Sequence, residues 1–105
     1  MSHPFFTDPR TYFAQGWHDL GTGHGYVKYV NQADQWCGII EFHQLLDGEW
    51  CGESVPFQGF DNDQSRPQWN VESFDPLTLS PSILCSPEKG GCGSHGYIRQ
   101  GQWVS

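Results

Sequence analysis

The sequence predicts a small, mainly β domain of about six short strands arranged as hairpins, with little helix. Its 105 residues leave room for one domain, because independently folding domains usually contain about 100–150 residues. Thirteen glycines and seven prolines are spread along the chain, and no segment shows a sustained helical period. Leucine, isoleucine, valine and phenylalanine total only 22 residues, so the 16 aromatic residues must supply much of the buried area.

The amino-terminal third contains one clear strand. Residues 1–10 lie outside any periodic segment and are expected to form a flexible arm, or a strap across a neighbour, before a domain of residues 11–105. Thr11–Leu20 fits a short strand or a single helical turn equally well. Gly21–Gly25 has glycines at alternate positions and is predicted to be a loop. Tyr26–Val30 combines aromatic and β-branched residues, which favour a strand.

The remainder of the chain is predicted to form further hairpins. Asp47-Gly48 is a strong hairpin signal between two segments rich in aromatic and apolar residues. The Asp75-Pro76 turn and a three-residue loop, Arg99–Gly101, separate two further pairs of short segments. In addition to Tyr26–Val30, the predicted strands are Trp36–Leu45, Glu49–Phe57, Trp69–Phe74, Leu77–Leu79, Gly96–Ile98 and Gln102–Val104.

The register of the central hairpin has chemical consequences. If its loop has three residues, with Gly48 in the left-handed conformation, His43 lies opposite Cys51. Because side chains alternate across a strand, Cys37, His43 and Cys51 would then share one face. A two-residue loop would instead place His43 and Cys51 on opposite faces of the hairpin.

Charge and hydropathy limit the classes of partner. Twelve acidic residues against five basic ones give a formal charge of -7, and the basic residues are scattered. Nucleic-acid binding is therefore not expected, because it depends on clustered lysine and arginine. No apolar run approaches the roughly 18 residues of a membrane span, and the amino terminus lacks a signal-peptide pattern. The chain is expected in a reducing cytoplasm, where paired cysteines hold metal more often than they form disulfides.

The cysteines and histidines therefore form a predicted metal site. Cys92 and His95 make a Cys-x-x-His pair flanked by glycines, which lets two side chains reach one ion. Three thiolates with one imidazole favour structural Zn²⁺ in a closed tetrahedral site. The predicted ligands are Cys51, Cys85, Cys92 and His95, with His43 and Cys37 in reserve. Buried thiols or a reducible disulfide are the alternatives.

Residues 77–104, LTLSPSILCSPEKGGCGSHGYIRQGQWV, resemble the signature of a family of small proteins of unknown function from bacteria and bacteriophages. The signature reads Leu-x-Pro-Ser-Ile, a short gap, Cys-x-Ser-His, an aromatic residue, Ile and a later Gly. The matching residues are Leu79, Pro81, Ser82, Ile83, Cys92, Ser94, His95, Tyr97, Ile98 and Gly101. Upstream, Cys51-Gly52 followed by Val55-Pro56 resembles a further family motif.

The resemblance implies that Cys51, Cys92 and His95 bind metal. Family members often have two or three closely spaced cysteines where this chain has only Cys51, so the fourth ligand is either Cys85 or His43. The resemblance also suggests a phage or actinobacterial source, and hence the cytoplasm of a host cell. Some bacterial relatives lie beside genes for ubiquitin-like conjugation.

Two functional readings follow from the predicted zinc site. A zinc-dependent hydrolase would need an open metal position and a general base, for which Glu53 is the candidate because it shares a strand face with Cys51. Four protein ligands would close that position, so a non-enzymatic role is predicted instead. Ser82 lacks the Gly-x-Ser-x-Gly context of a nucleophile elbow. His18-Asp19 with His24 is more typical of a turn than of a ligand set.

The predicted function is therefore a zinc-binding, phage-encoded protein that acts by protein–protein interaction, as a host-factor modulator or a minor virion part. The candidate contact residues are Phe5, Phe6, Trp17, Phe60, Asp61 and Asp63. The alternative is that these aromatic side chains fill a core that is poor in aliphatic residues. The oligomeric state is left open.

Overall fold

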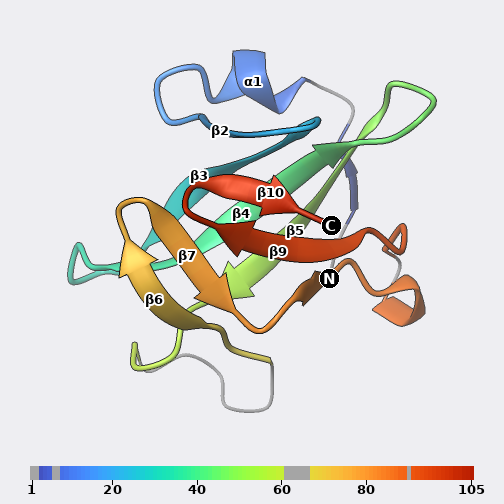
Figure 1. The fold of residues 1–105 in the computed structure, drawn as a ribbon. Helices are drawn as coiled ribbons and strands as arrows, with labels where there is room; N and C mark the ends of the chain where they lie inside the picture. The colour runs from blue at the N-terminus through green and yellow to red at the C-terminus, as the bar shows by residue number, and fades with distance from the viewer. Residues whose placement is uncertain (1–2, 6–7, 61–66, 90) are drawn as a thin grey trace.

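The computed structural model of the chain describes residues 3–5, 8–60, 67–89 and 91–105. It confirms a mainly β fold with little helix and adds short strands to those predicted (Figure 1). The strands are β1 (His3–Phe5), β2 (His18–Gly21), β3 (His24–Val30), β4 (Trp36–Gln44), β5 (Trp50–Pro56), β6 (Asn70–Phe74), β7 (Leu77–Ser80), β8 (Ile83–Leu84), β9 (His95–Arg99) and β10 (Gln102–Val104). The helices are α1 (Pro9–Tyr12) and a 3₁₀ turn, η1 (Pro87–Lys89).

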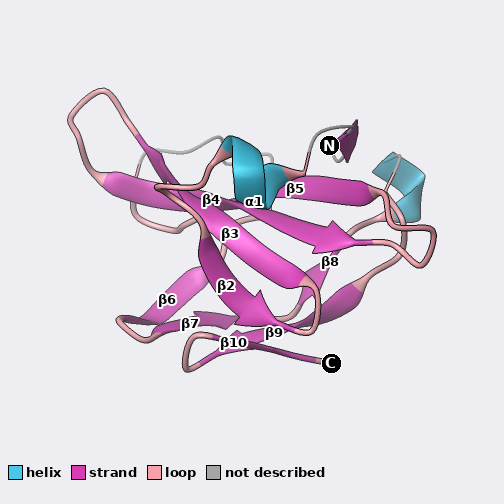
Figure 2. Ribbon diagram, turned by 90° about the horizontal axis from the view of Figure 1, so that it is seen from above, coloured by secondary structure: helices cyan, strands magenta, loops and turns pink. Residues whose placement is uncertain are grey.

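The strands form two layers. One layer is a five-stranded antiparallel sheet in the order β1-β5-β4-β3-β2. The other layer contains the β6-β7 hairpin and a three-stranded sheet in the order β10-β9-β8. Figure 2 shows the second layer beneath the five-stranded sheet, with α1 on the opposite side of that sheet. Each face of the large sheet is therefore covered by a different part of the chain.

The amino-terminal segment contributes to the large sheet. Strand β1 pairs with β5, so the sheet gains an edge strand from residues 3–5. Helix α1 begins at Pro9, and the side chain of Asp8 accepts a hydrogen bond from the backbone N–H of Arg10 as its N-cap. The segment 11–20, for which sequence left two possibilities, contains both the end of this helix and the start of β2.

The central hairpin has the predicted three-residue loop. His43 lies opposite Cys51 in the β4-β5 ladder, and the Leu45 N–H donates to the Glu49 carbonyl at 2.7 Å. Gly48 has a φ of 90°, the left-handed conformation that the loop requires. His43 and Cys51 therefore lie on the same face of the sheet, as the longer loop predicted.

Two other turns differ from the prediction. Arg99 pairs with Gln102, so the last hairpin has a two-residue loop, Gln100-Gly101, and not three residues. Both loop residues have positive φ, the conformation of the two-residue turns that match strand twist. The segment 21–25 is likewise not a plain loop, because Thr22-Gly23 forms a tight turn between β2 and β3. Here the glycines permit the turn, and the flanking residues still pair.

The main core lies between the two layers. Inward side chains of the large sheet meet apolar residues of the second layer, and all are almost fully buried. These residues are Leu20, Tyr26, Ile39, Val55, Phe57, Leu77, Leu79, Ile83, Ile98 and Trp103. A second cluster on the other face of the sheet contains Val27, Phe42 and Trp50, packed against Phe13, Trp17 and Ile40. Aromatic side chains supply much of both clusters, as the composition predicts.

A glycine of β9 allows a tryptophan to pack closely across the β9-β10 hairpin. A Cβ atom at Gly96 would lie 2.6 Å from the Trp103 ring. Gly96→Ala is therefore expected to destabilise the fold by about 1–3 kcal/mol, the usual cost of overpacking, and to lower the melting temperature. Gly16→Ala is the control, because its Cβ would meet only the Phe13 carbonyl oxygen at 3.9 Å. Equal melting temperatures for the two variants would contradict this packing.

Candidate functional site

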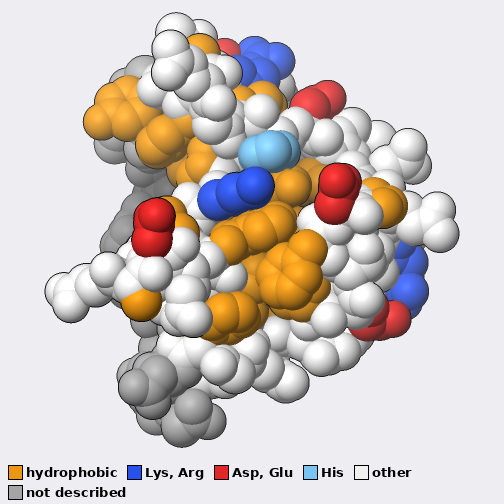
Figure 3. Space-filling view, turned by 90° about the vertical axis from the view of Figure 1, so that its left-hand side faces the viewer, with side chains coloured by type: hydrophobic (Ala, Val, Ile, Leu, Met, Phe, Trp, Pro, Cys, Tyr) orange, Lys and Arg blue, Asp and Glu red, His pale blue; other side chains and the backbone are white. Residues whose placement is uncertain are grey.

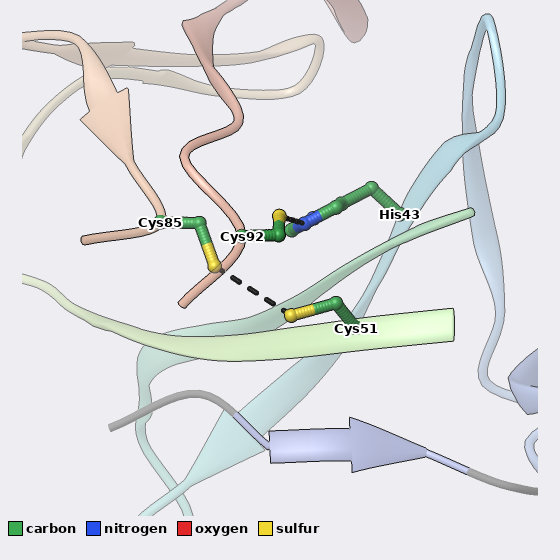
Figure 4. Close-up of side chains that lie close together, drawn as sticks. All are labelled: His43, Cys51, Cys85 and Cys92. Atoms are coloured by element: carbon green, nitrogen blue, oxygen red, sulfur yellow. Dashed lines mark hydrogen bonds between the residues drawn. The ribbon is translucent and has the colours of Figure 1, made fainter. Parts of the chain in front are cut away.

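Four side chains from both layers converge at one end of the core. His43 and Cys51 come from neighbouring strands of the large sheet, whereas Cys85 follows β8 and Cys92 precedes β9. Their ligand atoms all lie within 4.8 Å of one another (Figure 4). The Cys51 and Cys85 sulfurs are 3.6 Å apart, and His43 Nε2 lies 2.9 Å from Cys92 Sγ. We call these four residues the Cys₃His cluster.

The Cys₃His cluster can hold a metal ion. None of its cysteines forms a disulfide. Metal–sulfur bonds of about 2.3 Å in a tetrahedral site would separate two sulfurs by about 3.8 Å, close to the spacing of Cys51 and Cys85. Burial raises the pKa of Cys92, but hydrogen bonds from the Ser94 backbone and His43 outweigh burial and lower it. The surroundings of Cys92 thus favour the thiolate that a metal binds.

A buried carboxylate orients the histidine of the cluster. Glu41 is fully buried, and its Oε1 accepts a hydrogen bond from His43 Nδ1 at 2.8 Å. This bond leaves His43 Nε2 directed at the thiols, which is the usual support of a metal-binding histidine. The other oxygen of Glu41 lies 3.0 Å from His24 Nδ1. Burial lowers the pKa of His43, but Glu41 and Cys92 raise it to about 9.

Glu53, the candidate base of a zinc hydrolase, lies opposite Glu41 in the β4-β5 ladder. It is 8 % exposed, and within the described part of the chain its Oε2 has no hydrogen-bond partner. Burial and the adjacent Glu41 raise the pKa of Glu53 to about 8. A carboxyl group that is protonated at neutral pH is a poor general base. With four protein ligands in the cluster, the geometry does not favour that mechanism.

His95 takes part in a different contact. Its Nε2 lies 2.8 Å from Ser82 Oγ, so the serine hydroxyl can donate a hydrogen bond to the imidazole. Strand β9 directs Gly96 and Ile98 into the core, which places the exposed His95 on the opposite face of the strand. The structure therefore brings together three of the four predicted ligands, and His43 occupies the place expected for His95.

Ser82 and His95 form a pair that sequence reasoning missed. Ser82 directly precedes β8, and β8 pairs with β9, which begins at His95. The Trp69 Nε1–H donates to the Ser82 carbonyl at 3.2 Å and so restrains its backbone. Among the described residues, His95 Nδ1 has no hydrogen-bond partner, so the arrangement is a pair and not a triad. A serine hydroxyl within reach of an imidazole is the arrangement of an activated nucleophile.

The Cys₃His cluster and the Ser82–His95 pair share one pair of strands. Cys85 lies three residues after Ser82, and Cys92 lies three residues before His95. The Cys85 N–H donates to the Ser94 carbonyl at 2.8 Å, which closes the ladder between the two segments. A ligand that holds Cys85 and Cys92 in place would therefore also hold the backbone segments that carry Ser82 and His95.

The other predicted site residues lie elsewhere. Cys37 is buried, and its sulfur lies 3.7 Å from the Tyr29 carbonyl oxygen, outside the Cys₃His cluster. His18 stacks on Tyr26 at 4.7 Å, while His24 contacts Glu41, so these two histidines do not share a site.

The predicted partner surface is only partly described. Trp17 packs on Phe42 and Trp50, and Phe60 is half-buried against the main core. Asp61, Asp63 and Phe6 lie outside the described residues, and Phe5 is described only in its strand pairing. Figure 3 shows one side of the molecule, where hydrophobic side chains gather around a histidine and a basic residue. A partner contact stays a prediction. In the described residues, no helix is long and apolar enough to cross a membrane.

A comparison with protein families gives one match. The model of the family described as bacterial ubiquitination-like system serine protease (BubE) matches residues 50–105. This range contains Ser82, His95 and the three cysteines of the Cys₃His cluster. No curated protein matches the chain, and no solved structure does. The expectation of a non-enzymatic protein is wrong, because the matched family is one of proteases.

Proposed function

The chain belongs to the BubE family of serine proteases of the bacterial ubiquitination-like system, and we propose that Ser82 and His95 are its catalytic residues. The 2.8 Å contact between Ser82 Oγ and His95 Nε2 is the observation that supports the assignment. Both residues lie within the range that the family model matches, and their separation is that of a hydroxyl group hydrogen-bonded to an imidazole. The His95 side chain is exposed, so a substrate can reach the pair.

The pair can perform peptide hydrolysis in two steps. Ser82 Oγ attacks the scissile carbonyl while its proton moves to His95 Nε2, and the same proton then passes to the leaving amine. The resulting acyl ester on Ser82 is hydrolysed by a water molecule that gives a proton to His95. The second step returns the proton to Ser82 as the carboxylic acid leaves. The restraint on the Ser82 carbonyl by Trp69 holds the nucleophile in position during both steps.

We further propose that the Cys₃His cluster binds Zn²⁺ through His43, Cys51, Cys85 and Cys92. Three thiolates and one imidazole are a donor set that selects zinc over calcium or magnesium. With four protein ligands the ion would have a structural role, because a catalytic zinc keeps a position open for water. It would join the large sheet to the two segments that carry the catalytic pair.

The protein partner expected from the sequence is then, in this proposal, the substrate itself. The family description places the protease in a ubiquitination-like system, so we propose protein substrates of that system. A cytoplasmic location and a phage source stay predictions. No contact of Trp17 or Phe60 with a partner is needed for the proposed chemistry.

Labelling with a fluorophosphonate tests the nucleophile. We expect one covalent adduct per chain, mapped by peptide mass spectrometry to Ser82, because the reagent captures serine hydroxyls activated by a base. Ser82→Ala is expected to abolish the adduct. Ser80→Ala, which removes a hydroxyl two residues upstream in β7, is the matched control and should label like the wild type. Labelling of Ser82→Ala at the wild-type rate would contradict the proposal.

A further inference from the structure

Strand β8 is an edge strand that follows the proposed nucleophile directly. Among the strands that the structure describes, it pairs only with β9, in the three-stranded sheet. Ile83 lies opposite Gly96, Leu84 lies opposite His95, and the next residue, Cys85, donates its N–H to the Ser94 carbonyl. In an antiparallel ladder hydrogen-bonded pairs alternate with pairs that are not bonded. Since Cys85 and Ser94 form a hydrogen-bonded pair, the next pair, Leu84 and His95, is not hydrogen-bonded through the backbone.

The backbone of Leu84 therefore points away from β9. Its N–H and C=O face the open edge of the sheet, and the described residues supply no hydrogen bond to either group. The Leu84 side chain is 50 % exposed, a large apolar group beside His95 on the outer face of the sheet. An exposed edge with an unpaired N–H and C=O is a template for another extended chain.

We propose that the substrate binds as an extended polypeptide segment that adds a strand to β8 and pairs with the backbone of Leu84. This inference rests on the proposed protease function, because it places the substrate at Ser82. Residues two apart along a strand are separated by about 7 Å, so a segment paired with Leu84 extends alongside Ser82 within the length of two residues. Strand addition supplies main-chain hydrogen bonds with little dependence on substrate sequence.

The proposal defines a chemical class of substrate. A helix cannot pair with an edge strand, because its backbone groups are already bonded within the helix. The substrate is therefore an extended tail or linker, with its N–H and C=O groups unpaired before binding. The Leu84 side chain adds an apolar contact for a substrate side chain close to the scissile bond.

An N-methyl scan of a substrate tests the pairing. The wild-type protein is assayed with a library of internally quenched, unstructured octapeptides, and the peptide cleaved fastest is remade with one backbone amide methylated at a time. Methylation at the position facing Leu84 is expected to reduce kcat/KM about tenfold or more, the effect of one lost hydrogen bond. The neighbouring positions should lose far less, because alternate residues of a strand face opposite directions. If the loss of kcat/KM did not alternate between successive methylated positions, the proposal would be overturned.

Leu84→Pro tests the same contact from the protein side. Proline removes an N–H that the described fold leaves unbonded, which edge strands tolerate. In Leu84→Pro we expect kcat/KM for the peptide to fall at least about tenfold more than the rate of fluorophosphonate labelling at Ser82. The fall in kcat/KM should also be larger in Leu84→Pro than in Leu84→Ala, which keeps the backbone N–H. Equal losses in both assays, or equal losses in both variants, would overturn the pairing.

The two proposals fail in different ways. If the fluorophosphonate does not label Ser82, the protease assignment itself is wrong. If Ser82 is labelled and no unstructured peptide of the library is cleaved, strand addition at β8 is overturned while the nucleophile stands. A dimer detected by analytical ultracentrifugation and abolished by Leu84→Pro would also overturn it, because a second copy of the chain would then occupy the edge.

Discussion

Replacing His95 with alanine is expected to reduce kcat for peptide hydrolysis by about 10²- to 10⁴-fold, the usual contribution of a positioned general base. The melting temperature should change little, because surface substitutions usually alter stability by less than about 0.5 kcal/mol. His95 is exposed, and its side chain bonds only Ser82 among the described residues. Steady-state kinetics and thermal unfolding of the same preparation measure the two effects.

His43→Ala is the matched control, because it removes the other histidine of this region. His43 is 2 % exposed and is held between Glu41 and Cys92. Its removal leaves the buried Glu41 carboxylate without one of its two histidine partners, and breaking a buried charged pair typically costs about 3–5 kcal/mol. We expect His43→Ala to lose bound zinc and stability, measured by elemental analysis and thermal unfolding. Loss of zinc from His95→Ala but not from His43→Ala would restore the ligand set predicted from sequence.

Removing the metal is expected to unfold the protein. Structural zinc sites contribute about 10–16 kcal/mol of apparent binding free energy in small domains. Since native proteins are stable by only about 5–15 kcal/mol, the metal-free chain should be largely unfolded. The small aliphatic core supports the same expectation, because small domains with little core usually need a metal or a disulfide to be stable. Thermal unfolding followed by circular dichroism, with and without a chelator at neutral pH, measures this effect.

Cysteine variants separate the cluster from the rest of the core. Cys85→Ser should abolish stoichiometric zinc binding and the cooperative transition, because Cys85 links the segment after Ser82 to the cluster. Cys37→Ala is the matched control, since Cys37 is equally buried but lies outside the cluster. It is expected to retain zinc. A melting temperature that does not respond to chelation would show that the cluster holds no structural metal.

The parts of the fold that follow local rules could be predicted from sequence. Asp47-Gly48 predicted the central hairpin, and a glycine in the left-handed position set its register. The sequence allowed a two-residue or a three-residue loop, and with the three-residue loop His43 and Cys51 lie side by side, so strand alternation could place half of the Cys₃His cluster once the loop length was known. Glu41 could have been found by the same alternation, because it lies two residues before His43 on the same strand face.

The catalytic pair could not be predicted in this way. Ser82 and His95 are 13 residues apart, and the Gly-x-Ser-x-Gly pattern used to reject Ser82 belongs to a strand–turn–helix arrangement that this chain does not use there. What joins the two residues is the pairing of β8 with β9, and sequence reasoning placed no strand at β8, which has only two residues. Short strands carry too little pattern to be recognised without their partner.

That the chain is a hairpin-rich β domain, with a small core and thiols suited to metal, can be read from its residues. Those properties come from composition, turn residues and strand alternation, which act over a few neighbouring residues. Which histidine joins the cysteines and which contacts the serine depends on contacts between segments that are far apart in the sequence. Strand β9 buries Gly96 and Ile98 in the core, so His95 must face outward to Ser82, while His43 faces the thiols across the layers.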